Sequence, residues 1–276
     1  GEPTRHRDGR SFHHLRRIQN LLSTGEVCDK VVNGMCLDVH KYAPIGEVAD
    51  PEFHHYFSAG VIKLVQIFNP GVSVRKVFFL VPVILACLCI IPAFFIVKKK
   101  AGLFGGAVAA IVVATTTFFV ERTPAGFSDT DGYTVLFPLL ILWFIFEAFD
   151  SEKTIHKIIY SSLAGLMVGL FAFAWSGWWF TMFSIMGAIG VKILYHAFHD
   201  KTVKPWKNKK VIDSVLILFV FFIITCIAIS VLMAPGFLLS PIKGAITRFT
   251  ITTTATTKEG FWLGASNLWP NVYTTV

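Results

Sequence analysis

Six long apolar runs constrain this chain more than any other feature of its sequence. They are residues 77–97, 101–120, 133–149, 158–175, 178–198 and 211–233. Roughly 20 residues in an α-helix cross a hydrocarbon core about 30 Å thick, and each run is close to that length. The composition, 54% hydrophobic and 15% charged, is also far from that of a soluble domain. The sequence therefore predicts an all-α, multi-pass transmembrane helical bundle.

Basic residues indicate how this bundle is oriented. Lysines gather at 98–100, at 153 and 157, and between 201 and 210. These are alternate connecting segments and share one side of the membrane, which the positive-inside rule makes the cytoplasmic side. Arg75 and Lys76 do not follow this trend, but they end a long segment, where the rule is weaker. A short basic loop between two spans reports orientation, so we do not expect the stretch KTVKPWKNKK to bind nucleic acid.

This orientation divides the chain into three regions. Residues 1–76 form a first external loop with short or interfacial helices, and 77–233 form the transmembrane region with about six spans. Residues 234–276 begin a later external loop, and 121–132 form the second external loop. Within the first loop, Phe53–Phe68 is apolar but too short to span comfortably; it could lie along the interface as an amphipathic helix or lead directly into the first span. Cys28 and Cys36 lie in the same loop, where oxidising conditions permit a disulfide; the sequence leaves open whether one forms.

The second external loop carries two carboxylates separated by one residue, Asp129 and Asp131. Carboxylates with this spacing can converge on a divalent cation, and Mg²⁺ and Mn²⁺ prefer such oxygen ligands. Arg122 lies upstream, where its guanidinium can hold a carboxylate or a phosphate in position. Gly126 would let the intervening loop fold back closely.

A second interpretation of these carboxylates is purely structural. Asp131 nearly abuts an apolar run, and acidic residues near a helix N-terminus cap it and complement its dipole. Asp150 and Glu152 repeat the spacing before a span on the cytoplasmic side. There we expect helix capping, so the spacing by itself does not establish a metal site.

Three motifs resemble the catalytic subunit of oligosaccharyltransferases of the archaeal or prokaryotic type. Arg122-Thr123, Gly126 and Asp129-Thr130-Asp131, followed by Phe137-Pro138, resemble the family's second external loop. The run Asp8–Arg16, in which an Asp opens a helix, and the later Tyr42–Gly46 resemble its first external loop. Leu268–Val276 is similar to archaeal members just before a Glu of a later external loop.

The resemblance implies the fold, the reaction and the partners. It implies the fold of the glycosyltransferase C superfamily, with the active site on the extracytoplasmic side of a prokaryotic, archaeal-type membrane. The family transfers a preassembled oligosaccharide from a polyprenyl (dolichyl) phosphate or diphosphate carrier to Asn in Asn-x-Ser/Thr. It implies Mn²⁺ or Mg²⁺ as cofactor and contact with membrane lipids. We expect the chain to be a fragment of the N-terminal membrane region, incomplete at both ends and inactive by itself.

The resemblance also implies roles for four residues. Asp8 would bind the metal and engage the acceptor amide, and Asp129 would bind the metal. Asp131 would bind or support the metal, and Arg122 would organise the carboxylates. An amide nitrogen is a poor nucleophile, so holding and polarising it beside the metal-bound phosphate is the chemistry that such a site must supply.

Three other interpretations fit the sequence less well. A transferase that moves single sugars from a lipid-phosphate carrier would keep the fold, but the motifs favour the first reaction. A transporter would place ionisable residues along a pathway inside several spans, whereas Glu147, Lys192 and Asp213 lie near cytoplasmic ends. A zinc site that combines histidines with Cys28 and Cys36 lacks the usual ligand spacing. The histidines in question are His13, His14, His54 and His55.

Overall fold

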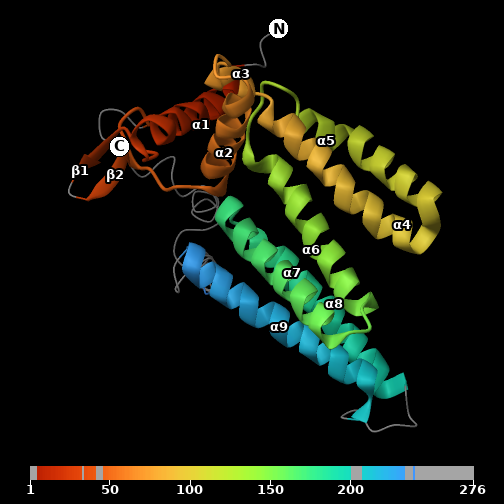
Figure 1. Ribbon diagram of the computed structural model, residues 1–276. Coiled ribbons are helices and arrows are strands. Elements are labelled where there is room, and N and C mark those ends of the chain that lie inside the picture. The colour runs from red at the N-terminus through yellow and green to blue at the C-terminus, as the bar shows by residue number, and fades with distance from the viewer. Residues whose placement is uncertain (1–4, 33, 42–45, 200–206, 234–238, 240–276) are drawn as a thin grey trace, which may run out of the picture. The chain divides into compact units, whose positions relative to one another are not determined.

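The computed structural model describes residues 5–32, 34–41, 46–199, 207–233 and 239, with side chains from Ser11 onward except that of Phe118. The predicted motif at Leu268–Val276, most of region 234–276, Tyr42–Ile45, and Lys201 and Lys204 of the basic loop lie outside these residues, as does the side chain of Asp8. Figure 1 shows the helical character of the described part.

The first external region folds into two helices and a small sheet. Helix α1 (Arg5–Thr24) contains Asp8, and helix α2 (Phe53–Phe68) has the bounds expected for the interfacial helix. Between them, strands β1 (Lys30–Val32), β2 (Met35–Asp38) and β3 (Glu47–Val48) form an antiparallel sheet in the order β1-β2-β3. Cys28 and Cys36 are joined by a disulfide, which answers the question that the sequence left open.

An apolar core holds this region together at the start of the first long helix. Leu15 and Ile18 of α1 pack with Ala59 and Ile62 of α2 and with Val77 and Phe78 of α3 (Val74–Phe78). Ile18, Ile62 and Phe78 are fully buried. Burying a side chain of this size contributes roughly 1.5–3 kcal/mol, so α1 and α2 are packed onto α3 and are not separate elements.

Helix α4 (Val81–Thr115) contains a reversal at Gly102, where φ is 72° and ψ is −174°. A side chain rarely adopts this positive φ, and glycine adopts it without strain. A Cβ at Gly106 would lie 3.0 Å from the carbonyl oxygen of Phe94, although twelve residues of straight helix would span about 18 Å. The two arms of α4 therefore lie against each other, as Figure 1 shows. Lys98–Lys100 sit just before the reversal.

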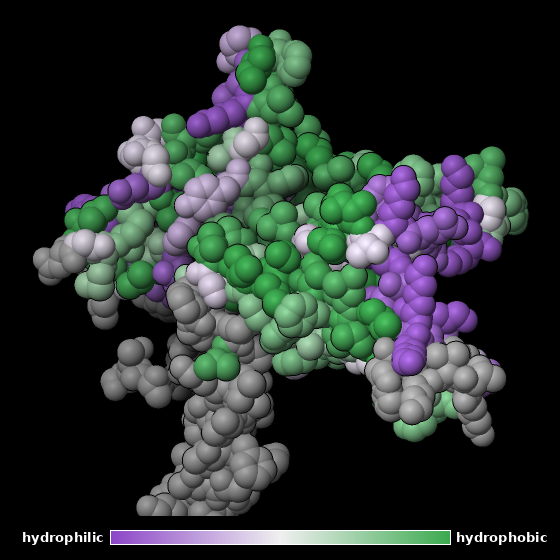
Figure 2. All heavy atoms as spheres, turned by 60° about the horizontal axis from the view of Figure 1, so that its bottom comes forward, coloured by the Kyte–Doolittle hydropathy of each residue, from purple (hydrophilic) through white to green (hydrophobic). Residues whose placement is uncertain are grey.

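The remaining long helices are α6 (Tyr133–Asp150), α7 (Thr154–Ala174), α8 (Trp178–His199) and α9 (Lys209–Leu232), and α6 packs on both α4 and α7. Among the described residues, five helical segments are long and apolar enough to cross a membrane, the first being Val74–Thr115 with its reversal. The protein is therefore a multi-pass membrane protein. Figure 2 shows a broad hydrophobic area on the face in view, as lipid contact requires, with hydrophilic residues gathered toward its edge.

Small residues let two of these helices approach closely. A Cβ on Gly165 would lie 2.8 Å from the carbonyl oxygen of Phe221, and one on Gly169 would lie 2.4 Å from Cβ of Ala228. Both contacted residues belong to α9, so these two glycines of α7 form the close-packed helix interface that small residues at four-residue spacing predict.

The capping role expected for Asp150 and Glu152 is wrong. Asp150 is the last residue of α6, and α7 begins after Lys153 without a side-chain cap. Asp150 instead lies 3.2 Å from Nζ of both Lys99 and Lys100. A carboxylate at a helix C-terminus is unfavourable for the helix dipole, and the two lysines compensate for it. The role of Asp150 is therefore set by ion pairs between α4 and α6, which the spacing of Asp150 and Glu152 did not reveal.

Candidate functional site

The second external loop connects α5 (Thr117–Arg122) to the short 3-10 helix η1 (Thr130–Gly132) at the start of α6. Gly126 has φ of 97°, and its N–H donates to the carbonyl oxygen of Phe79 over 3.0 Å. The expected role of this glycine is confirmed, because the positive φ lets the loop fold back onto the first long helix. This contact holds the loop at the end of the bundle where α1 and α2 also pack.

Asp129 is largely buried, with 8% of its surface exposed. Its Oδ1 accepts a hydrogen bond from the backbone N–H of Thr130 over 2.7 Å, which caps η1. The sequence suggested that Asp131 caps the following span, but α6 begins after Gly132 without a side-chain cap, and the residue that caps a helix here is Asp129. Capping uses one carboxylate oxygen and is compatible with metal binding, since an ionised carboxylate has about four lone-pair sites.

Asp131 is more exposed and forms an ion pair with Arg122. Nη1 of Arg122 lies 2.9 Å from Oδ2 of Asp131, and the two side chains are 48% and 33% exposed. An exposed pair of this kind contributes at most about 1 kcal/mol to stability. Its effect is to orient: the guanidinium holds one carboxylate oxygen of Asp131 beside the loop that carries Asp129. Of the three residues that the sequence pattern groups, the structure pairs Arg122 with Asp131, and Asp129 lies two residues before Asp131 in the same loop.

Helix α1 reaches the same loop through Ser11. The backbone N–H of Ser128 donates to Oγ of Ser11 over 3.1 Å, and both serines are almost fully buried. Asp8 lies three residues before Ser11 in α1, and residues three apart share a helix face. Asp8 therefore belongs to the helix that contacts the Asp129 loop.

Three histidines lie beneath this loop: His14 from α1, and His54 and His55 from α2. Burial lowers the pKa of His14 to about 4 and that of His55 to about 2, and it holds the pKa of His54 well below the usual 6.5. Their rings pack against one another, with the His14 and His54 centroids 5.1 Å apart. All three imidazoles are therefore neutral at pH 7.

The zinc site that sequence analysis set aside would need Cys28 and Cys36, which the disulfide makes unavailable. His14, Glu52 and His55 do lie close enough to hold a metal ion, with one ligand atom of each within 4.8 Å of the others. However, Nδ1 of His55 accepts from the backbone N–H of Glu52 over 3.1 Å, so its Nε2 carries the proton and faces Nδ1 of His14 over 3.1 Å. These hydrogen bonds explain the close approach of His14 and His55 without a metal ion between them.

A second buried polar cluster fixes α1 to the sheet. Asp38 is 1% exposed and accepts from Arg16 and Arg17 of α1, while Nε2 of His13 lies 3.0 Å from its Oδ2. Burial by itself would raise the pKa of this carboxyl, but the charge and hydrogen bond of Arg16 hold that pKa well below its usual range. Sequence analysis missed Asp38. The adjacent arginines at 16 and 17 were the only signal, since a helix that buries an arginine needs an acidic partner.

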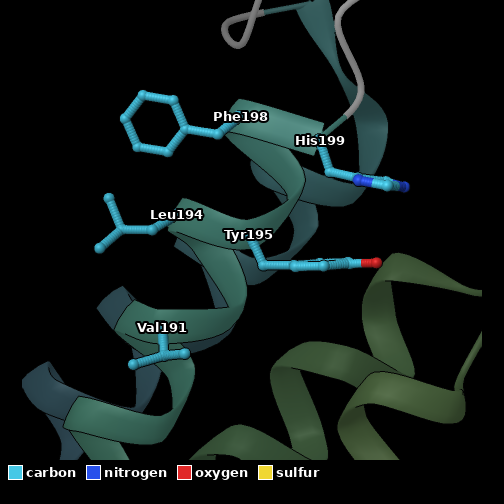
Figure 3. A pocket seen from close by; sticks show the side chains of 5 residues that line it. All are labelled: Val191, Leu194, Tyr195, Phe198 and His199. Atoms are coloured by element: carbon cyan, nitrogen blue, oxygen red, sulfur yellow. The ribbon is translucent and has the colours of Figure 1, made fainter.

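The structure also has a pocket on α8, lined by Val191, Leu194, Tyr195, Phe198 and His199 (Figure 3). All five side chains come from one helix, and the ring of Tyr195 stacks on that of His199 with centroids 5.0 Å apart. None is a carboxylate or a permanently charged group, so this pocket offers no candidate for the chemistry described above.

Comparison with known proteins gives consistent matches. Residues 8–273 match the family described as "Oligosaccharyl transferase STT3, N-terminal". A curated relative, the dolichyl-phosphooligosaccharide-protein glycotransferase of Methanococcus voltae, is 28% identical over 207 residues, which cover 72% of this chain and 22% of that protein.

Two solved structures of the Archaeoglobus fulgidus oligosaccharyltransferase share the fold. One, a complex with Zn and sulfate, gives a TM-score of 0.59 at 15% identity, covering 95% of this chain and 34% of that one. The other, tethered to an acceptor peptide with the NVT sequon, gives 0.57 at 15% identity, covering 95% and 32%. The chain thus spans about a third or less of the length of these proteins. With a family match that extends over nearly all of its residues, this chain belongs to the oligosaccharyl transferase STT3 N-terminal family.

Proposed function

We propose that this chain supplies the membrane region and part of the active site of an enzyme for protein N-glycosylation. The enzyme transfers a preassembled oligosaccharide from a polyprenyl (dolichyl) phosphate or diphosphate carrier to Asn in Asn-x-Ser/Thr. One observation carries the proposal: a buried Asp129 lies beside an Asp131–Arg122 pair in a loop that α1 contacts, within a chain of this family. The name of the Methanococcus voltae relative supports the carrier, and the NVT peptide bound to the Archaeoglobus fulgidus protein supports the acceptor.

The donor set fits Mn²⁺ or Mg²⁺. Asp129 and Asp131 offer hard carboxylate oxygens at a two-residue spacing, and Asp8 would add a third from α1. When bound, the cation would supply positive charge that stabilises a departing phosphate or diphosphate. The Zn in one Archaeoglobus fulgidus structure supports metal binding in the family, without deciding which metal this chain takes.

The residues of the chain act mainly by positioning. Capping of η1 holds Oδ1 of Asp129 toward Thr130, and Arg122 holds Oδ2 of Asp131, so neither carboxylate must be ordered when the substrates arrive. Such preorganisation lowers the entropic part of the barrier. Asp8 would accept a hydrogen bond from the acceptor amide N–H, which weakens its conjugation with the carbonyl and makes the nitrogen a better nucleophile. The guanidinium of Arg122 adds a positive charge next to the incoming carrier phosphate.

The site lies on the extracytoplasmic side in this proposal. Lys99 forms ion pairs with Glu147 and Asp150. These pairs join the reversal of α4, beside Lys98–Lys100, to the C-terminal end of α6. The Asp129 loop is at the other end of α6. The positive-inside rule assigns the lysine-rich end to the cytoplasm, so the carboxylates face the outside, where membrane lipids and the lipid carrier border them.

The test is the Asp129→Asn substitution in the full-length protein, purified in detergent and supplied with lipid-linked oligosaccharide and a fluorescent Asn-Val-Thr peptide. A ligand that supplies several kcal/mol of charge stabilisation corresponds to a loss of more than about 100-fold in glycopeptide formation. Asp150→Asn is the matched control, because Asp150 belongs to a carboxylate pair of equal spacing near the lysine-rich end. Turnover of Asp129→Asn equal to that of the control would refute the proposal, and a Gln-Val-Thr peptide sets the background.

A further inference from the structure

His54 occupies a buried position between two segments that are far apart in the sequence. Its side chain is fully buried. Nδ1 lies 3.1 Å from the hydroxyl of Tyr133, at the start of α6, and Nε2 lies 3.3 Å from Oγ of Ser128 in the second external loop. One helix of the first external region is thereby joined to both ends of the segment that contains Asp129 and Asp131.

Ser128 links His54 to the segment that carries the carboxylates. It is fully buried and directly precedes Asp129, and its backbone N–H is held by Oγ of Ser11. Its backbone and its hydroxyl are thus tied to two different helices, α1 and α2. Because both its hydroxyl and its backbone N–H are held, the Ser128 residue as a whole cannot shift easily, and the hydrogen bond with His54 thereby restrains the position of the adjoining Asp129.

The imidazole is suited to this contact because it is neutral. A neutral imidazole has one N–H donor and one acceptor nitrogen, so it can bond a hydroxyl on each side at once. The rings of His14, Phe78 and Tyr133 surround it, with centroids 5.1, 5.8 and 5.7 Å away, and both hydroxyls that it bonds belong to fully buried residues. Loss of the imidazole would leave these two buried hydroxyls without this hydrogen-bond partner, which is unfavourable.

We propose that His54 is a positioning residue for the metal-binding carboxylate of Asp129, acting through its Nε2 hydrogen bond to Ser128. The inference rests on the proposed function, since it assigns a supporting role at the same site. Residues that hold a metal ligand in place change metal affinity by about 10–100-fold when they are removed. A residue that only fills space would instead change the amount of folded protein.

Two substitutions separate the nitrogen atoms of the ring. His54→Gln places an amide near the position of Nε2 and can keep the bond to Ser128, whereas His54→Asn places it near Nδ1 and can keep only the bond to Tyr133. His54→Leu removes both. If Ser128 is the important partner, the His54→Gln protein keeps its function and the His54→Asn protein does not. Ser128→Ala removes the same contact from the other side without changing the ring.

The measurement is Mn²⁺ binding to the full-length protein without substrates, followed through the electron paramagnetic resonance signal of free Mn²⁺. We expect His54→Leu, His54→Asn and Ser128→Ala to weaken Mn²⁺ binding by about 10–100-fold, and His54→Gln to stay within about threefold of the unmodified protein. Glycopeptide formation should show the same order at limiting Mn²⁺, with the losses largely restored at saturating Mn²⁺.

His55→Leu is the matched control. His55 is an equally buried histidine of the same helix, but its hydrogen bonds run to Glu52 and His14 and not to the loop. Equal Mn²⁺ affinity in His54→Leu and His55→Leu, or in His54→Gln and His54→Asn, would overturn the inference. If His54→Leu does not fold, Ser128→Ala decides by itself, and unchanged Mn²⁺ binding there overturns it.

Asp129→Asn distinguishes failure of this inference from failure of the proposed function. If Asp129→Asn abolishes Mn²⁺ binding while Ser128→Ala and His54→Leu bind normally, the metal site stands and the role of His54 is refuted. If Asp129→Asn binds Mn²⁺ normally, the proposed metal site fails and His54 has no carboxylate to position.

Discussion

Acidification should open the first external region of this protein while leaving the long helices in place. The perturbation is a change from pH 7 to pH 5 in detergent solution. The responsible groups are the buried histidines His14, His54 and His55, which are neutral in the folded protein because burial lowers the pKa of each. In the unfolded segment their pKa returns to about 6.5.

The sign follows from proton uptake. Because the folded pKa of each histidine is depressed, the unfolded segment binds more protons between the two pKa values, and stability falls as the pH falls through that window. With a folded pKa of about 4, His14 is still neutral at pH 5. Its unfolded counterpart is charged, and this difference costs about 2 kcal/mol relative to pH 7.

His55, with a folded pKa of about 2, contributes a similar amount. Because the two rings bond to each other, their joint contribution lies between about 2 and 4 kcal/mol. The fully buried His54 acts in the same direction, because burial also lowers its pKa. Of two nearby carboxyl groups, one counteracts this loss of stability and the other does not contribute to it. Burial raises the pKa of Glu52, so that carboxyl favours the folded state on acidification, and Asp38 remains ionised because its pKa is held below the usual range.

The assay is amide hydrogen exchange of α1 and α2, corrected for the intrinsic effect of pH on exchange. A loss of 2 kcal/mol is about a 30-fold rise in the opening constant. A His14→Phe, His55→Phe double variant should lose the part of this pH dependence that these two histidines supply, whereas replacement of the exposed His156 by Gln should not change it. Equal protection of α1 and α2 at pH 7 and pH 5 would refute the burial argument.

Two further predictions concern packing and the buried ion cluster. Gly169→Leu should lower the stability of the detergent-solubilised protein by about 1–3 kcal/mol, because its Cβ would lie 2.4 Å from that of Ala228; thermal unfolding measures this, with Gly187→Ala, which meets nothing within 4 Å, as control. A fall in melting temperature no larger than that of the control would contradict the close packing. Asp38→Asn should destabilise α1 by about 3–5 kcal/mol, because the guanidinium of Arg17 stays buried without its ionised partner. Trypsin cleavage within α1 measures this, and a cleavage rate equal to that of an exposed-site variant such as Lys63→Gln would show that the cluster does not hold the helix.

Local patterns in the sequence predicted those parts of the structure that depend on local properties. The apolar runs predicted the long helices because hydrophobicity and length suffice to identify a membrane span. The bounds of Phe53–Phe68 came from an apolar stretch too short to span, and Gly126 from the need for a positive φ. Asp129, Asp131 and Arg122 were found together because all three lie within a segment of ten residues.

The same patterns gave a wrong or an undecided prediction where the role of a residue depended on a contact that the pattern did not contain. The spacing of Asp150 and Glu152 suggested a cap, but Lys99 and Lys100, some fifty residues earlier, decided the role of Asp150. The cysteine pair was undecided until the β1–β2 hairpin brought the two residues to a Cα separation of 5.2 Å.

The class of the protein, its helices and the loop with its two carboxylates and arginine can therefore be inferred from the residues alone. The contacts that hold this loop in place become visible only in the folded protein. Ser11 and His54 bond Ser128 across separations of 117 and 74 residues, and Asp38 meets Arg17 across 21. The physical reason is burial: a histidine or serine is an ordinary polar residue in a sequence, and its hydrogen bonds gain strength and direction only where packing excludes water.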